Sequence, residues 1–555
     1  MAKGIDTGEF HHREAANTLS VVRSAGIVSV AVLMSRVTGL VREILMARLF
    51  GAGQTYDAFL LGFRIPNLTR DLFAEGALSS AFVPALVQCL AKNGKREAAR
   101  LANLVATMVI VVVGGFCLLG VVFAPAFVHV LAPGFEQVPG KFDLAVLMTR
   151  IMFPFLLLVA LAAQAMGILN ACNQFAVPAM ASTFFNIGSI CFGLVLGFLA
   201  GPRIGISPIE GMAWGVVLGG ALQLVWQVPS LRRSGFRFRL AFDARDPGLR
   251  QIIRLMGPAI LGSAAVQINV MVNTNFASRI SDAMRGPDGP VSWLGYAFRF
   301  MQLPLGIFGV AIASATLPAV SRCVAAGNMD DFRRTLSRSI GMVFLLTIPS
   351  SVGLVLLGNS MIGAVYEGGR FDSYDTRQTA VALACYALGL GGYSALKVLT
   401  PAFYSLDDAR TPMIVSLLSI LVNLVVVMSL IQVAGFGHAG LALSTSVVAI
   451  CNFLVLFWIM RNKAGGIYGR NLTASLLKVV LASAAMGAVV AFSSRQFLSI
   501  FGANKTGYLV DLAVSIPLGV VVYYAVCRAV KVDELELATR ALAGPLLRLR
   551  DRIVL

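Results

Sequence analysis

The sequence contains few charged residues. Asp, Glu, Lys and Arg make up 13% of its 555 residues, whereas a soluble globular chain carries about 25%. Hydrophobic residues make up 57%, and they gather in stretches long enough to cross the apolar core of a bilayer, which takes about 20 residues of helix. This composition excludes an ordinary water-soluble domain and predicts an all-α, polytopic membrane protein.

The sequence also lacks the patterns of common catalytic and metal sites. Its eight cysteines include no CxxC pair and lie in or beside apolar stretches, so we interpret them as small buried hydrophobic residues. The four histidines form no metal-like cluster, and neither a Walker A loop nor an HExxH pattern is present. We therefore expect a transporter and not an enzyme, with no metal and no cofactor.

The charge that is present is mostly positive, with a net charge of +18. In a soluble protein this would suggest nucleic acid, but cytoplasmic loops of membrane proteins accumulate Lys and Arg, and we expect no nucleic-acid partner. Basic loops such as residues 232–233 and 333–334 follow even-numbered apolar stretches, which predicts that both termini are cytoplasmic. Residues 405–411, which are slightly acidic, and Arg495 with Lys505 depart from this alternation.

The apolar stretches predict about fourteen transmembrane helices. Their approximate extents are residues 21–46, 56–88, 98–130, 142–170, 177–200, 207–230, 250–280, 290–322, 334–362, 376–404, 411–433, 437–461, 471–494 and 508–529. Several of these are longer than one bilayer crossing requires, and they are expected to be bent or to extend beyond the bilayer.

The chain repeats itself at a constant offset. The segment SAFVPA at 80–85 returns as SATLPA at 314–319, and the same offset carries Pro178 onto Pro412. Both copies of the segment lie in even-numbered stretches, so the repeat has parallel topology, which predicts two six-helix lobes related by a pseudo-two-fold axis along the membrane normal. Two C-terminal helices remain outside the repeat.

This pattern divides the chain into six parts. They are a cytoplasmic tail (1–20), an N-lobe with spans one to six (21–232), a cytoplasmic amphipathic linker (233–249), a C-lobe with spans seven to twelve (250–462), spans thirteen and fourteen (463–531) and a second cytoplasmic tail (532–555).

Charged residues cluster in the first two predicted spans, where hydrocarbon should surround them. They are Arg36, Arg42, Glu43, Asp57, Arg64, Arg70, Asp71 and Glu75. Each charge at mid-bilayer costs about 2.5–3.5 kcal/mol on insertion scales, so these side chains must face a watery cavity or one another. At 100° per residue, Asp57, Arg64, Asp71 and Glu75 form one stripe. Internal pairing that serves packing alone, for example Arg64 with Asp71 or Arg42 with Glu43, is the structural alternative for these charges.

The excess of arginine in and near the spans points to an anionic substrate. Arg36, Arg42, Arg70 and Arg299 outnumber the acids that could lie deep in the membrane. Guanidinium is planar and matches the geometry of phosphate. We expect these four arginines to bind a phosphorylated substrate in a cationic central cavity, with Asp57, Glu75, Glu43 and Arg64 as cavity or gating residues.

The motifs of this chain resemble those of the MurJ (MviN) lipid II flippase family, in the multidrug/oligosaccharidyl-lipid/polysaccharide exporter superfamily. The resemblance extends over essentially the whole chain, and the motifs that carry it are SRVTGLVR at 35–42, FGAG at 50–53, DAF at 57–59, PNL at 66–68, FAEGA at 73–77, MGPAILG at 256–262, VSW at 291–293 and AFYS at 402–405.

The resemblance implies that the chain moves a lipid-linked disaccharide-pentapeptide across the bacterial inner membrane for cell-wall synthesis, by alternating access of two lobes. It places the family's cavity arginines at Arg36, Arg42, Arg70 and Arg299, and implies that spans thirteen and fourteen border a groove for the polyprenyl tail. Some relatives carry acids beside the C-lobe arginine, where this chain has Phe298 and Gln302. Cell-wall synthesis proteins are the partners this role suggests. Membrane potential and ion coupling both remain open as energy sources.

Two other transport functions compete with this interpretation. A flippase for another polyprenyl-diphosphate-linked glycan would need the same arginines. A cation-coupled multidrug exporter should favour acids in its cavity, because its substrates are mostly cationic. A membrane enzyme acting on lipid phosphates would need a carboxylate or histidine cluster, and the adjacent acids Asp407 and Asp408 are more simply interpreted as a turn.

Overall fold

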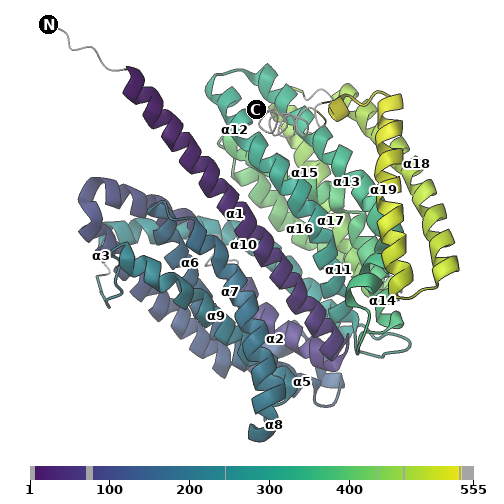
Figure 1. Ribbon diagram of the computed structural model, residues 1–555, viewed down its shortest axis with the longest axis horizontal. Helices are drawn as coiled ribbons and strands as arrows, with labels where there is room; N and C mark the ends of the chain where they lie inside the picture. Colours follow the sequence, from purple (N-terminus) through teal and green to yellow (C-terminus); the bar gives the residue numbers. More distant parts are fainter. Residues whose placement is uncertain are drawn as a thin grey trace. The chain divides into compact units, whose positions relative to one another are not determined.

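The computed structural model describes residues 7–70, 79–243, 245–433, 435–466, 469–536 and 539, and Figure 1 shows their arrangement as helices. Within these ranges no strand is present, and the only β-type pairings are two isolated bridges. The chain divides into two compact units, residues 1–46 with 54–267 and residues 47–53 with 268–555. The predicted all-α fold class is thereby confirmed.

Unit 1 contains most of α1 and the helices up to the first part of α10. Its elements are α1 (Thr7–Phe50), α2 (Gln54–Arg70), α3 (Ser79–Val122), α4 (Ala124–Leu131), the 3-10 turn η2 (Pro133–Gln137), α5 (Lys141–Met152), α6 (Phe155–Ala171), α7 (Ala176–Leu194), the π-helical segment η3 (Val195–Ala200), α8 (Gly201–Ile204) and α9 (Pro208–Arg233). Helix α7 packs along α9, α2 along α5, and α3 along α6.

Unit 2 contains the remaining helices. They are the second part of α10 (Pro247–Arg279), α11 (Pro290–Pro304), the π segment η4 (Leu305–Val310), α12 (Ala311–Ala325), α13 (Met329–Tyr366), α14 (Ser373–Ala387), α15 (Leu390–Ser405), α16 (Arg410–Met428), the π segment η5 (Ser429–Val433), α17 (Gly437–Lys463), α18 (Gly469–Phe501) and α19 (Lys505–Ala529). The boundary between the two units falls inside α10, between residues 267 and 268, whereas the predicted lobes meet at a linker over 233–249. The predicted domain extents stay a prediction.

The sequence repeat reappears as a repeat of helices. Helices α7 and α16 both have 19 residues, and their first residues, Ala176 and Arg410, are separated by the offset of the sequence repeat. Each of the two is followed directly by a π-helical segment. The pair α2 and α5 of unit 1 corresponds in order to α11 and α14 of unit 2, and both pairs pack together. Each unit is therefore built on the same helix plan.

Close approach of α7 and α9 depends on glycine. Gly211, Gly215 and Gly219 recur at intervals of four on α9. A Cβ added to Gly215 would lie 2.6 Å from Ser189 O, and one added to Gly219 would lie 2.7 Å from Phe185 O. Small residues at this spacing let helix backbones touch within a membrane, where lipid removes the usual hydrophobic drive for helices to associate.

Breaks lie both between and within the predicted spans. Gly94 (φ 79°) interrupts α3 between the predicted second and third spans. The chain turns at residues 153–154 between α5 and α6, inside the predicted fourth span, and α14 meets α15 at 44°. By length and composition, 10 spans of the described chain could cross a membrane, or 11 with the bent pair. Helices α1 and α2, which carry the charged cluster, are not among them, and the number fourteen stays a prediction.

The hairpin of α18 and α19 is attached to α13 by a buried carboxylate. Asp511 of α19 has no exposed surface, and its oxygens accept hydrogen bonds from Ser360 of α13, Ser494 of α18 and Ser515 of α19 at 2.5–2.8 Å. Three hydroxyl donors satisfy a group that would otherwise be expensive to bury. Figure 1 shows the two helices side by side at the edge of unit 2.

The end of α1 and the following turn belong to unit 2. The backbone N of Arg370 donates to Arg48 O at 3.0 Å, and the Tyr296 hydroxyl donates to Gly51 O at 3.3 Å. Gly51 has φ +67°, and a Cβ added there would lie 2.6 Å from Arg370 O. The chain therefore leaves unit 1 within α1, docks by its backbone on unit 2 and returns at Gln54.

We expect Gly51→Ala to lower the free energy of unfolding by about 1–3 kcal/mol, because it places a side chain in a left-handed conformation and against a backbone oxygen. The measurement is the thermal unfolding midpoint of the purified protein in detergent. Gly53→Ala is the matched control, since a Cβ there meets no atom within 4 Å. Equal midpoints for the two variants would contradict this account of the turn.

Candidate functional site

The predicted site residues fall on three helices. Arg36, Arg42 and Glu43 lie on α1, Asp57 and Arg64 on α2, and Arg299 on α11. Arg70 is the last residue of α2, and its side chain lies outside the described part of the structure, as do Asp71 and Glu75. Arg36 and Arg299 are exposed, and Arg42, Glu43 and Arg64 are half-buried.

Arg42 lies against aromatic rings within unit 1. Its guanidinium carbon is 5.2 Å from the ring centre of Phe185 on α7 and 5.9 Å from that of Phe63 on α2. The ring of Phe155 packs on both phenylalanines, at 5.2 Å and 5.7 Å between ring centres. Cation–π contact of this kind stabilises a guanidinium away from bulk water.

The same region of α1 is fixed on α7 by an amide. Asn186 Nδ2 donates to Ser35 O at 3.1 Å and to Thr38 Oγ1 at 3.3 Å. A Cβ added to Gly39 would lie 3.4 Å from Asn186 Nδ2, so Gly39 is where α1 and α7 come close. These contacts fix the backbone of α1 between Arg36 and Arg42 on α7.

Asp57 has a partner that the sequence did not predict. Its Oδ2 is 2.9 Å from Nζ of Lys141, the first residue of α5, and neither side chain has exposed surface. Lys141 Nζ also lies 4.6 Å from the ring centre of Phe135. No pattern in the sequence connects positions 57 and 141. The one available signal was the position of Lys141 directly before the predicted span 142–170. The pair ties α2 to α5, and the gating role of Asp57 stays a prediction.

The structure tests only one part of the alternative that the charged residues pair with one another. Asp57 is paired, but with Lys141 and not with a member of the predicted stripe. The suggested pair of Arg64 with Asp71 lies partly outside the described residues.

Arg299 occupies an exposed position in unit 2. It lies on α11, which leads directly into the π segment η4 at Leu305, and such segments are frequent at functional sites. Its neighbour Phe298 packs edge-on against Tyr386 of α14, with ring centres 5.4 Å apart, and Gln302 is exposed. Phe298 therefore joins the packing of unit 2, and Gln302 adds no charge beside Arg299.

A polar cluster joins α10, α16 and α17 within unit 2. Asn269 donates to Ser419 Oγ at 3.1 Å, Asn423 to Asn273 Oδ1 at 2.9 Å, and Asn273 to Thr445 Oγ1 at 3.1 Å. Within the described chain, Asn269 Oδ1 and Asn423 Oδ1 are buried without a hydrogen-bond partner. No group of three His, Cys, Asp or Glu able to hold a metal occurs among the residues described. Hydrogen bonds among these three asparagines, Ser419 and Thr445 therefore connect α10 with α16 and α17 in unit 2.

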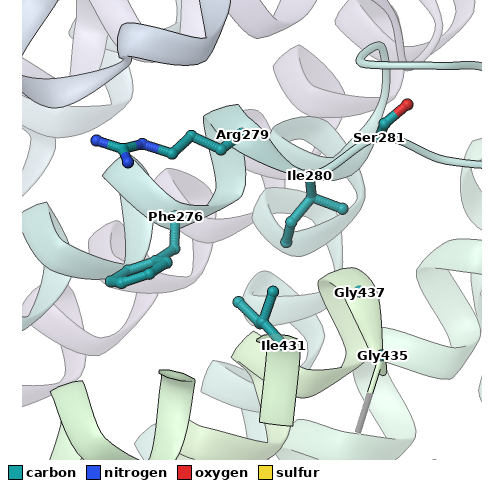
Figure 2. Close-up of a pocket in the computed structure, with 7 residues that line it drawn as sticks. All are labelled: Phe276, Arg279, Ile280, Ser281, Ile431, Gly435 and Gly437. Atoms are coloured by element: carbon teal, nitrogen blue, oxygen red, sulfur yellow. The ribbon is translucent and has the colours of Figure 1, made fainter. Parts of the chain in front are cut away.

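A cavity of about 330 Å³ opens near the end of α10 in unit 2 (Figure 2). Its lining residues are Phe276, Arg279, Ile280, Ser281, Ile431, Gly435 and Gly437. Figure 2 shows Ile280 and Ile431 pointing toward one another. Arg279 is the one charged residue among those seven, and none of the predicted site residues lines this cavity.

The adjacent acids Asp407 and Asp408 form a turn, as the sequence predicts. Asp408 accepts hydrogen bonds from the Thr411 backbone N at 3.0 Å and from its hydroxyl at 2.8 Å, and it lies 2.7 Å from Lys463 Nζ. The Lys463 ammonium and these donors lower the pKa of Asp408 to about 2. A carboxylate held ionised at a helix start is a poor general acid or base near neutral pH, which weakens the enzymatic alternative.

Taken together, the long apolar helices and the arginine-bearing surfaces define a multi-pass membrane transporter. Residues 46–506 match the family model for lipid II flippase MurJ, and the chain belongs to this family. It is 35% identical over 457 residues to lipid II flippase MurJ of Burkholderia cenocepacia, covering 81% of this chain and 85% of that protein. It is 36% identical over 448 residues to probable lipid II flippase MurJ of Vibrio cholerae, covering 79% and 82%.

Solved structures agree with this assignment. A lipid II flippase MurJ in an inward closed conformation matches with a TM-score of 0.73 and 26% identity, over 90% of this chain and 99% of that one. An inward-facing multidrug resistance MATE family transporter of the MOP superfamily matches with a TM-score of 0.66 over 80% of this chain and 98% of that one, at 14% identity. The second likeness shows the shared fold alone. The predicted family and fold class are therefore confirmed.

The Asp57–Lys141 pair should stabilise unit 1 strongly. Asp57→Leu and Lys141→Met each leave one buried charge without its partner, and each should lower the free energy of unfolding by about 3–5 kcal/mol. Replacing both residues with apolar ones, Asp57→Leu with Lys141→Met, should cost clearly less than the sum of the two single changes. Thermal unfolding midpoints of the four proteins measure the coupling, and strictly additive losses would show that the pair does not act as a unit.

Proposed function

We propose that this protein moves lipid II, the lipid-linked peptidoglycan precursor, from the inner to the outer leaflet of the bacterial inner membrane. The observation that carries the proposal is membership of the lipid II flippase family over residues 46–506. The role is that of a transporter and not of an enzyme, and it serves peptidoglycan and cell-wall synthesis. The substrate and the surrounding membrane lipids are its partners, and contacts with cell-wall synthesis proteins belong to the same proposal.

In this proposal Arg36, Arg42 and Arg70 of α1 and α2, and Arg299 of α11, bind the diphosphate of the substrate. Two phosphate groups offer several oxygen acceptors, and guanidinium binds such oxygens with paired N–H donors. The aromatic contacts of Arg42 hold this cation within unit 1, beside Phe63 of α2 and Phe185 of α7. Glu43, Arg64, Asp57 and Glu75 would set the local charge and the gating.

We further propose that the two units alternate access to the two faces of the membrane, with both termini in the cytoplasm. The chain passes between the units within α1, before Gln54 and within α10, so relative motion would have to be absorbed at these three positions. The hairpin of α18 and α19 would border a groove for the polyprenyl tail. Membrane potential acting on moving charge provides about 2.3 kcal/mol per elementary charge per 100 mV, which could drive this motion. Coupling to the movement of an ion is the alternative energy source.

A flippase for a different polyprenyl-diphosphate-linked glycan is the closest alternative, since the same arginines would serve it. Depletion of the protein in its host separates the two. We expect lipid II to accumulate on the cytoplasmic side of the membrane, and accumulation of another lipid-linked glycan in its place would favour the alternative. A multidrug exporter is disfavoured by the sign of the charge, because arginines repel cationic drugs.

Arginine substitutions test the binding role directly. We expect Arg42→Ala and Arg299→Ala to reduce flipping of lipid II by about 10–100-fold, because each removes a hydrogen bond between charged groups worth about 1.5–3 kcal/mol. The measurement is transport of fluorescently labelled lipid II in reconstituted vesicles. Arg322→Ala, on the exposed side of α12, is the matched control and should transport normally. Wild-type flipping by a folded Arg42→Ala or Arg299→Ala protein would remove that residue from the proposed site.

A further inference from the structure

The segment that joins α9 to α10 is held on α3 as an extended strap. Residues 236–243, which we call the linker strap, have neither helix nor strand. Asn103 Nδ2 donates to Arg237 O at 3.2 Å, the backbone N of Arg239 donates to Asn103 Oδ1 at 3.2 Å, and that of Ala241 donates to Thr107 Oγ1 at 3.1 Å. Arg100 completes the attachment with an ion pair to Asp243 at 2.9 Å.

These contacts come from one face of α3, since Arg100, Asn103 and Thr107 are spaced by three and four residues. They satisfy the strap's backbone with side chains, as a neighbouring strand would otherwise do. The strap is therefore a fixed element of unit 1 and not a free loop, and the side chains it presents outward have defined positions.

The outward side chains of the strap are large and apolar. Phe238, Leu240 and Phe242 alternate along it and are 57%, 66% and 76% exposed. In extended chain, residues two apart share a face, so the three form one apolar row. Phe236, at the start, is buried instead. A row of this kind exposed to water would be unfavourable, and contiguous exposed apolar surface commonly marks an interaction site.

The strap lies where two membrane helices change from charged to uncharged. In α3, Lys95, Arg96 and Arg100 precede a run from 101 to 122 without a charged residue. In α9, residues 211–231 carry no charge and Arg232 with Arg233 follow. Both transitions mark the membrane surface, and the residues that hold the strap, at 100, 103 and 107, span the transition in α3.

The charge around the apolar row is positive. Arg237 and Arg239 are exposed between the apolar residues, and Arg232 and Arg233 are exposed at the end of α9. The acids nearby are engaged: Asp243 pairs with Arg100, and Asp246 accepts the backbone N of Leu249. An apolar row combined with guanidinium groups matches the boundary between lipid acyl chains and anionic headgroups.

We propose that the linker strap docks on the membrane surface, with Phe238, Leu240 and Phe242 inserted at the acyl boundary and Arg237 and Arg239 bound to the phosphates of anionic phospholipid. This contact anchors unit 1 at the point where the chain crosses toward α10, and it does not depend on which substrate the protein moves.

Photo-crosslinking of the full-length protein tests the proposal. p-Benzoylphenylalanine is introduced at position 240, and the protein is placed in bilayers of roughly three parts phosphatidylethanolamine to one part phosphatidylglycerol. After irradiation, mass spectrometry identifies the crosslinked molecules. We expect lipid adducts, with phosphatidylglycerol enriched about threefold over its share of the bilayer. The same probe at Ala326, an exposed position in the connection of α12 and α13, is the matched control and should give at least about tenfold fewer lipid adducts.

The double variant Arg237→Gln, Arg239→Gln tests the charge of the strap without changing how its backbone is held. Both arginines contact Asn103 through backbone atoms, so the strap should stay in place and lipid adducts should persist while the phosphatidylglycerol enrichment disappears. Adducts to another part of the chain, or adducts no more frequent than at Ala326, would overturn membrane docking. Unchanged enrichment in the double variant would overturn the role of the two arginines.

Discussion

The structure depends on how a very apolar chain accommodates its buried charge. Lys141 and Asp57 have no exposed surface and lie 2.9 Å apart, and Asp511 is enclosed by serine hydroxyls. In both places the polar group is satisfied inside one unit, and in both it joins different helices. A charge without such a partner would cost several kcal/mol, so these contacts fix which helices can pack together.

Corresponding positions in the two units carry polar groups of opposite charge. Lys141 begins α5 of unit 1, and Asp375, its counterpart at the offset of the repeat, lies in the first turn of α14 of unit 2. Lys141 ties α5 to α2 through Asp57, whereas Asp375 ties α14 to α11 by accepting a hydrogen bond from Trp293 Nε1 at 3.0 Å. The packing of the corresponding helices is retained while the polar groups differ. The two units therefore carry different polar groups at corresponding positions of a shared helix plan.

The sequence predicts features that depend on neighbouring residues better than contacts between residues far apart in the chain. Local signals worked: apolar stretches located the helices, the segment around Pro84 and Pro318 revealed the repeat, and the Asp407–Asp408 turn was recognised from residue type. The partner of Asp57 could not be found, because positions 57 and 141 are joined only by the packing of α2 on α5. The glycine interval at 211, 215 and 219 was a readable signal for close helix packing. Bends were expected in the longest predicted spans, but their positions at 153–154 and between α14 and α15 could not be located, since apolar composition continues through both.

Asp57 and Arg42 show two ways in which unit 1 accommodates charge among apolar helices. Asp57 is enclosed and has a partner of opposite sign at hydrogen-bonding distance, so exchanging that partner for a ligand would require unit 1 to open. Arg42 is half-buried beside the rings of Phe63 and Phe185, and its Nη1 is buried. Cation–π attraction is stronger where water is excluded, so these rings stabilise the guanidinium where an apolar side chain would not. Because the rings belong to α2 and α7, the charge of Arg42 also favours the packing of α1 against both helices, as the charge of Asp57 favours the packing of α2 against α5.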